Sequence, residues 1–458
     1  MDLETLKNIV GSQRITKLVI KTGVFGYAWV KAFQYCWEYH PEYCHKYVWR
    51  HKSFYSKFFS DTLLKYHLFP RVEIDSKGVD LSVQYGEHHF QNPLGNASGI
   101  DHSGWLVEGI SNLGFGFVEA GEVTPDVDVW KSKPEYAKQY FINVLPNTIL
   151  WTNPYKGKNM ALLISNLCRN QDNILNKKYK SYQNVQLGIN ISPSRTTVES
   201  VPYLIKLDYE NCMNNIAEFS DYIVINITEK DKSRRQPLIN LREKEELTKL
   251  VTKVRSRLAM QFGKIAALEH SQFDEVQAAE GVVDIHKIIQ GTVFRNSLCS
   301  KNSVPLLLLK IDSYYSEEEY KTICEVMEEQ KVDGAIVGST IPVNIGIKDK
   351  SQRRYTTTPW LAGAGGEVTK EHALRSLQLM YKYTQGRKLL ISSGGIFTGK
   401  DLYERMAFGA SLGQIFTALI VGGPYVPQNI LEEFAGLLKE NNETAQSIIG
   451  KHYRWVIQ

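Results

Sequence analysis

The stretch LLISSGGIFTGKDLYERMAFGASLGQIFTALIVGGP, residues 389–424, decides the fold. It opens on an apolar run of strand length, Leu389–Ser393, which ends at the pair Gly394-Gly395. A stretch with helical spacing follows, and then a second β-rich run, Leu412–Thr417. Strand, crossover helix and strand form the repeating unit of a parallel sheet.

The same alternation extends toward the N-terminus as far as Leu81, and it predicts eight strands in all. Eight parallel strands joined by helices predict a closed (β/α)8 barrel, which we place in residues 72–458. An insertion at about 256–303, between the fourth and fifth strands, is long enough to be a lid or a docking surface. The predicted strands are Leu94–Ser98, Phe115–Val123, Gln186–Ile191, Tyr222–Ile227, Leu306–Ile311, Gly334–Ser339, Leu389–Ser393 and Leu412–Thr417.

Glycines follow the seventh predicted strand, and a threonine ends the eighth. Backbone N–H groups at Gly394 and Gly395, a nearby helix start and the Thr417 hydroxyl together suit an anion. A phosphate site between these two strands recurs in TIM barrels, so we predict one here. The alternative is that the two glycines serve only a tight turn.

Composition excludes several classes of function. The 458 residues are 43% hydrophobic and 22% charged with a net charge of +5, as in an ordinary globular protein. The barrel region has no basic run interleaved with aromatic residues, which argues against nucleic-acid binding. The six cysteines are scattered without a CxxC pair, which argues against a zinc site and a disulfide framework.

Residues 1–71 differ in character from the rest of the chain. Residues 15–37 are rich in aromatic residues and long enough to cross a bilayer, but Lys21 and Lys31 interrupt the run. On an ideal helix these lysines share one face and the aromatic residues the other. We therefore expect an amphipathic helix that lies on a membrane or spans one, followed by a second amphipathic segment at 43–71. The alternative is two helices packed on the barrel.

At this point the chain resembles the class 2, membrane-associated dihydroorotate dehydrogenases over about residues 60–455. The likeness rests on residues 81–125 and 389–424, with LGIN, YIVIN, VPLLLLKI, DGAIV and LAGAGG between them in the family's order. The resemblance implies an FMN-linked barrel and N-terminal helices that form a quinone tunnel at the mitochondrial inner membrane. It explains more than a phosphate-sugar isomerase barrel, which accounts for the glycine pair alone.

The resemblance also implies which residues contact the cofactor. The lysine that lies against the flavin ring in the family matches Lys310, although this lysine could instead pair with a barrel carboxylate, either Glu229 or Glu119. Asparagines at two strand ends supply both donors and acceptors. The implied FMN contacts are Ser98, Gly99, Asn190, Asn226, Lys310, Gly363, Gly394, Gly395, Phe416 and Thr417.

The pattern departs from the family on the substrate side. Class 2 enzymes carry a catalytic serine in N-x-S-S-P-N after the fourth strand, and Glu229 holds that position in Asn226-Ile227-Thr228-Glu229-Lys230-Asp231. The Thr228 hydroxyl comes one position too early and, on an alternating strand, faces the other way. Further departures stand where the family has other polar residues, and they are His102, Glu122, Leu150, Asp231 and Ser339.

These replacements predict a catalytically inactive homologue that serves as a structural or accessory subunit of an inner-membrane complex, in contact with lipid and other membrane proteins. The alternative is an active FMN-dependent dihydroorotate dehydrogenase that reduces quinone with Glu229 as an unusual base. His102 fits a replacement in a silent site better than a general acid or base. Residues 230–235, KDKSRR, fit a solvated loop better than a phosphate or lipid contact.

Overall fold

The computed structural model describes most of the chain from residue 72 onward. The described residues are 72–125, 140–142, 147–151, 158–175, 185–194, 197–198, 201–228, 240–270, 304–344, 361–422 and 425–453. The N-terminal segment 1–71, the larger part of the predicted insertion and Glu229 lie outside them.

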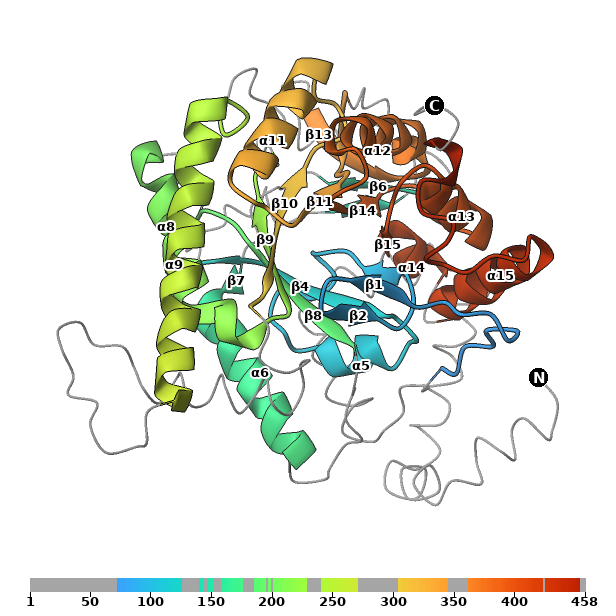
Figure 1. Cartoon of the computed structure of the whole chain (residues 1–458), viewed down its shortest axis with the longest axis horizontal. Coiled ribbons are helices and arrows are strands. Elements are labelled where there is room, and N and C mark those ends of the chain that lie inside the picture. The colour runs from blue at the N-terminus through green and yellow to red at the C-terminus, as the bar shows by residue number, and fades with distance from the viewer. Residues whose placement is uncertain are drawn as a thin grey trace, which may run out of the picture.

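A closed barrel of eight parallel strands forms the centre of the molecule (Figure 1). Pairing runs from β3 through β4, β8, β9, β10, β11 and β14 to β15, and β15 pairs with β3 to close the ring. All eight predicted strands are confirmed in the predicted order. Their bounds are β3 Leu94–Asn96, β4 Phe117–Thr124, β8 Gln186–Ile191, β9 Tyr222–Asn226, β10 Leu306–Ile311, β11 Gly334–Val337, β14 Leu389–Ser393 and β15 Leu412–Ile415.

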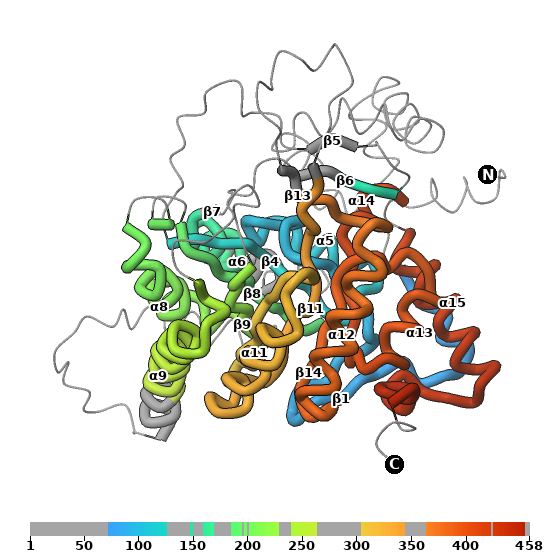
Figure 2. Tube along the Cα trace, turned by 90° about the horizontal axis from the view of Figure 1, so that it is seen from above, coloured from blue at the N-terminus to red at the C-terminus, as the bar shows by residue number. Residues whose placement is uncertain are grey.

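Helices surround the barrel (Figures 1 and 2). Their buried apolar residues share one hydrophobic core with those of the strands. Residues of the buried strand runs, such as Leu306–Ile311, are enclosed on both sides, as parallel strands require. Capping boxes at Ser316 and Thr398 begin two of the helices. The helices are α5 Val107–Ser111, α6 Met160–Leu175, α8 Ile205–Ile216, α9 Lys244–His270, α11 Glu317–Glu329, α12 Lys370–Thr384, α13 Gly399–Ala407, α14 Thr417–Gly422 and α15 Val426–Glu440.

Three smaller sheet features adjoin the barrel. β1 (Val83–Tyr85) and β2 (His88–Phe90) form an antiparallel hairpin, and the short β7 (Lys158–Asn159) pairs with β4. A four-stranded antiparallel sheet has the order β12-β13-β6-β5, with bounds β5 Tyr140–Ile142, β6 Thr148–Trp151, β12 Ile341–Asn344 and β13 Leu361–Gly366. Its strands follow β4 and β11 in the chain, so the sheet stands over the carboxyl ends of the barrel strands (Figure 2).

The start of the predicted insertion is helical. Helix α9 continues to His270, and so the first part of the stretch 256–303 extends a helix that packs on α8 and α11. Residues 271–303 lie outside the described residues, as does the expected N-terminal membrane segment. Among the helices that the structure describes, none combines the length and apolar character needed to span a bilayer.

Candidate active site

A buried lysine lies at the carboxyl end of the barrel. Lys310, on β10, donates a hydrogen bond to Ser98 Oγ at 2.6 Å, and its Nζ lies 4.0 Å from Glu119 Oε1. Burial lowers the pKa of Lys310, and the negative charges of Glu119 and Asp312 partly oppose that effect. The structure thus confirms the pairing of Lys310 with Glu119 and also places it against Ser98.

Glu119 is a fully buried carboxylate held by side chains from three other strands. Its Oε1 accepts from Asn190 Nδ2 at 2.9 Å, and its Oε2 accepts from Gln414 Nε2 at 2.5 Å. Asn96 exchanges two hydrogen bonds with the Glu119 backbone, at 2.9 and 3.0 Å. The acceptor atoms Asn190 Oδ1 and Gln414 Oε1 are buried and have no hydrogen-bond partner within the described residues. Sequence reasoning missed Gln414 and Asn96, whose only signal is a polar residue in a short apolar strand.

A second carboxylate joins the ends of β4, β8 and β9. Glu122 Oε1 accepts hydrogen bonds from Ser192 Oγ and, at 3.2 Å, from Asn226 Nδ2. Asn226 Oδ1 in turn accepts from the backbone N–H of Thr228 at 3.1 Å and from its Oγ1 at 2.6 Å. Thr228 therefore lies on the same side as Asn226, as residues two apart on a strand do. Its expected orientation relative to position 229 stays a prediction, because Glu229 lies outside the described residues.

Glycines line the part of the rim where phosphate binding is predicted. Gly394 and Gly395 both have a positive φ, 106° and 76°, and a Cβ on Gly395 would lie 2.5 Å from Lys370 Cα. A Cβ on Gly365 would lie 3.6 Å from Thr417 Oγ1, which brings β13 and the start of α14 together. The close approach of these backbones leaves their N–H groups as the natural donors to an anion.

Gly363 and Gly99, two further predicted cofactor residues, lie near this rim. A Cβ on Gly363 would lie 2.6 Å from Thr340 Oγ1, and a Cβ on Gly99 would lie 3.2 Å from the Phe416 ring. The same Cβ on Gly99 would lie 4.0 Å from His102 Cε1, so His102 stands near the cofactor residues. The described cofactor positions thus gather at one end of the barrel.

Three other residues depart from the family's pattern, and two of them, Ser339 and Leu150, lie within the described residues. The Ser339 backbone N–H donates to Ser313 Oγ at 3.3 Å, and Leu150 lies in β6 opposite Ala364 of β13. Asp231, with the rest of the segment 230–235, lies outside the described residues. Within the described part of the chain, no cluster of three or more His, Cys, Asp or Glu side chains could hold a metal ion.

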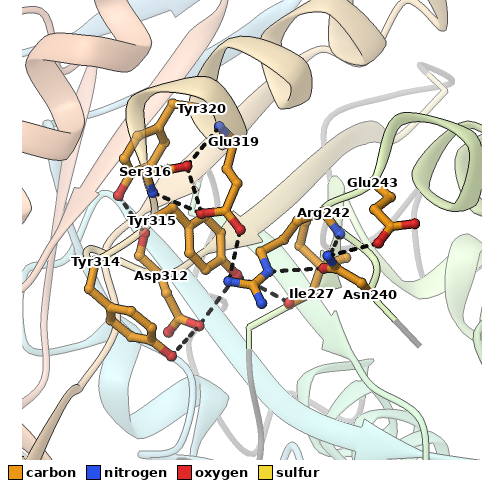
Figure 3. Close-up of polar contacts among 10 residues, drawn as sticks. All are labelled: Ile227, Asn240, Arg242, Glu243, Asp312, Tyr314, Tyr315, Ser316, Glu319 and Tyr320. Carbon is orange, nitrogen blue, oxygen red and sulfur yellow. Dashed lines mark hydrogen bonds and ion pairs between the residues drawn. The ribbon is translucent and has the colours of Figure 1, made fainter. Parts of the chain in front are cut away.

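A polar cluster beside the site ties β9 and β10 together (Figure 3). The Tyr315 hydroxyl donates to Ile227 O at 3.4 Å and to Asp312 Oδ2 at 3.3 Å. The Arg242 guanidinium lies 5.0 Å from the centre of the Tyr315 ring and 3.0 Å from Glu319 Oε1. The cluster therefore fixes the chain on both sides of segment 229–239, where the predicted base position lies.

The sequence and the fold are similar to those of dihydroorotate dehydrogenases. The sequence model described as "Dihydroorotate dehydrogenase" matches residues 80–438. The chain is 28% identical over 402 residues to "Dihydroorotate dehydrogenase (quinone), mitochondrial" of Kluyveromyces lactis, covering 85% of this chain and 79% of that protein. It is 27% identical to the mouse protein of the same name, covering 84% and 83% of the two chains. A ligand-free dihydroorotate dehydrogenase structure from Eimeria tenella matches with a TM-score of 0.66 at 24% identity, covering 86% and 98% of the chains, and shows the same fold.

Proposed function

Because the chain belongs to the dihydroorotate dehydrogenase family, we propose that it is an FMN-dependent oxidoreductase of the dihydroorotate dehydrogenase (quinone) type. The observation that carries the proposal is Lys310, a lysine kept in a buried strand by Ser98 and Glu119 at the end of the barrel where ligands bind. A cation there can stabilise negative charge on a reduced flavin ring. The comparisons favour this alternative over the expectation of an inactive subunit.

The residues present fit FMN at both of its ends. A Cβ on Gly394 would lie 2.7 Å from Thr369 Oγ1 and a Cβ on Gly395 would lie 2.5 Å from Lys370 Cα, and a backbone cradle of this kind suits a phosphate group. The buried Asn190 Oδ1 has no partner within the described residues and suits the N–H of a flavin ring. When bound, FMN would supply a hydride acceptor.

The chain's own residues would bind and orient the reactants. Lys310 would place its positive charge beside the cofactor ring, and Asn190 and Asn226 would offer amide groups to the ring edge and the substrate. Glu229 follows directly after Thr228 and is the residue we propose as the base that accepts the substrate proton. Glu229 comes three residues after Asn226 in the sequence, and Asn226 ends β9.

A catalytically inactive accessory subunit is the second candidate function, and one observation favours it. Glu122 already engages Ser192 and Asn226, two polar side chains that a substrate would otherwise use. A binding site whose polar groups bond to one another offers less to a ligand. In this second candidate the barrel would contact membrane-protein partners instead of turning over a substrate.

We place the protein at the mitochondrial inner membrane, with quinone as the electron acceptor. The support is that the relatives are named as mitochondrial and quinone-linked enzymes, together with the amphipathic character of residues 1–71. Lipid contact would follow from the same segment. No nucleic-acid partner is proposed.

The test uses the full-length chain purified in mild detergent. We expect flavin absorbance from the isolated protein, bleaching of that absorbance on adding dihydroorotate without oxygen, and its return on adding a soluble quinone. A protein that holds flavin but does not bleach would support the inactive subunit. A colourless protein that also fails to take up added FMN would contradict both the cofactor and the enzyme.

A further inference from the structure

Arg405, on α13, is a buried cation beside the rim where phosphate binding is predicted. The residue is 0% exposed. Burial lowers the pKa of Arg405 to about 10, and the negative charges of Glu404 and Asp401 oppose that effect, so the guanidinium stays positive at neutral pH. A buried charge is costly, and the contacts that keep Arg405 in this place therefore indicate its role.

Both hydrogen-bond acceptors of Arg405 in the described part of the chain are backbone carbonyls. Its Nη2 donates to Lys370 O at 2.6 Å and to Gly394 O at 3.3 Å. The other two nitrogens, Nε and Nη1, are buried and have no hydrogen-bond partner within the described residues. Because Gly394 follows β14 and Lys370 begins α12, one guanidinium joins the glycine pair to the start of this helix.

The two anchored carbonyls fix the direction of the neighbouring N–H groups. In a trans peptide unit the C=O and the N–H point in opposite directions. Gly394 O faces Arg405, so the N–H of Gly395 in the same peptide unit faces away from it. Lys370 O also faces Arg405, and the N–H groups of the first turn of α12 have no acceptor within that helix. An anion at this rim would thus meet N–H groups and not carbonyl oxygens.

A second residue on the same face of α13 holds the same two segments. Asp401 lies one helical turn before Arg405, and its carboxylate forms an ion pair with the Lys370 side chain. It also accepts hydrogen bonds from the backbone N–H groups of Phe397 at 2.9 Å and Thr398 at 3.0 Å. These contacts keep α13 beside α12 (Figures 1 and 2) without the help of Arg405. A substitution of Arg405 therefore acts on the two carbonyls.

We propose that Arg405 is the positioning residue of the phosphate cradle, which consists of the pair Gly394-Gly395 and the first turn of α12. By holding the carbonyls of Gly394 and Lys370, it keeps the N–H groups of the cradle turned toward the rim. Arg405 acts through these backbones and not as a ligand of the phosphate. The inference rests on the proposed function in taking FMN as the ligand, and it adds the residue that sets the affinity for the phosphate group.

The experiment measures binding of FMN and of riboflavin to the full-length protein, after removal of its flavin, by titration with flavin fluorescence as the signal. The two flavins share the same ring and differ in the phosphate group, so their affinities separate the cradle from the ring site. Arg405→Met removes the donor of both carbonyls. We expect the Kd for FMN to rise at least about tenfold, or about 1.4 kcal/mol, and the Kd for riboflavin to change by less than about threefold.

Three further variants keep the test decisive. Arg405→Lys keeps the charge and a donor, and should weaken FMN binding less than Arg405→Met does. Arg387→Met makes the same change in net charge at an exposed position before β14, at the opposite end of that strand, and should bind both flavins as wild type does. If Arg405→Met does not fold, Arg405→Gln takes its place, because its side chain is shorter and neutral but still polar. The same selective loss of FMN affinity is expected from it.

The proposal is overturned if FMN and riboflavin weaken equally, if FMN binding is unchanged in the methionine or glutamine variant, or if Arg405→Lys loses as much as Arg405→Met. A wild-type protein that binds riboflavin as tightly as FMN, or that binds neither, would overturn it as well. Binding is measured without turnover, so a failure of the proposed function shows separately, as FMN that binds but does not bleach with dihydroorotate.

Discussion

Charged side chains in the barrel mouth each receive partners from other strands. Lys310 contacts Ser98, and Glu119 receives amide hydrogen bonds from Asn190 and Gln414. A buried charge is costly unless it is paired and hydrogen-bonded, so these contacts explain how a cation and an anion persist in an apolar barrel. The opposite charges of Lys310 and Glu119 also attract each other.

The first prediction concerns the charge of Lys310. Lys310→Met removes the cation from the site, and we expect the rate of flavin bleaching by dihydroorotate to fall by at least about 100-fold, the size of effect seen when one preorganised charge-stabilising group is lost. The measurement is anaerobic stopped-flow absorbance on flavin-loaded protein. Lys388→Met is the control, because Lys388 is similarly enclosed, with 13% side-chain exposure, but precedes β14 at the opposite end of the barrel. Equal rates in the two variants would contradict a role for the Lys310 charge.

The sequence could predict some partners at the site and not others. A lysine at the end of the apolar run LLLLKI requires a carboxylate, and this reasoning reached Glu119 as one of two choices. Gln414 was missed because its partner lies 295 residues earlier in the chain, and only closure of the barrel brings the two together. The bond between Glu122 and Ser192 was missed for the same reason, since it depends on how β4 and β8 pair.

At the scale of elements, the buried barrel strands were the easiest to predict. Runs such as Leu306–Ile311 and Gln186–Ile191 match the structure to the residue, because they are apolar, of strand length and bounded by turns. The antiparallel sheet of β5, β6, β12 and β13 was not predicted. Half of the residues of β13, LAGAGG, are glycine, which gives no strand signal, and the segment forms a strand through pairing with β12 and β6.

The short helix α5 carries the buried carboxyl group of Glu108, and the carboxylate of Asp101 precedes the helix in the chain. Asp101 accepts hydrogen bonds from three backbone N–H groups at and before the start of this helix, among them Leu106 at 2.7 Å. All five residues of α5 are buried, and Glu108 is 3% exposed. Glu108 Oε2 has no hydrogen-bond partner within the described residues, and burial raises the pKa of Glu108 to about 7.

The buried carboxyl group of Glu108 predicts that the stability of the folded protein depends on pH. Because its pKa is raised, Glu108 holds its proton more tightly in the folded protein than in the unfolded chain. The folded state therefore keeps its full stability below the ordinary pKa of 4.5 and loses stability as the pH rises through about 7. The loss is on the order of 3 kcal/mol at most. Glu108→Gln stays neutral and should melt at a higher temperature than wild type at pH 8, with little difference at pH 4.5.

The measurement is thermal unfolding of both proteins across that pH range. Glu371→Gln, on the exposed face of α12, controls for the change in net charge and should follow wild type at every pH. Parallel melting curves for Glu108→Gln and wild type from pH 4.5 to 8 would contradict an uncompensated carboxyl group in α5.

At the scale of the whole molecule, closure of the barrel depends on small residues at two places. The seam between β3 and β4 has the single register pair Gly95 with Phe117. A Cβ on Gly95 would lie 2.3 Å from the Phe117 ring, and one on Gly188 would lie 2.0 Å from the Tyr222 ring. These two rings also meet edge to face, with centroids 6.3 Å apart. Large aromatic side chains therefore fill the barrel only because glycines face them.

The last prediction follows from this seam. Gly95→Ala adds one methyl group where the Phe117 ring lies, and Phe117 cannot move aside because it is fully buried against Phe90 and Tyr222. Overpacking of this kind costs about 1–3 kcal/mol, and because the change is at the closing pair it should lower the melting temperature of the whole barrel. Gly436→Ala is the control. Its Cβ would meet only the flexible end of Lys77 at 3.0 Å, and alanine favours a helix interior over glycine by about 1 kcal/mol, so α15 should gain stability. The same chemical change should thus shift the melting temperature in opposite directions at the two positions. A Gly95→Ala protein that melts at or above wild type would show that the seam has room to spare.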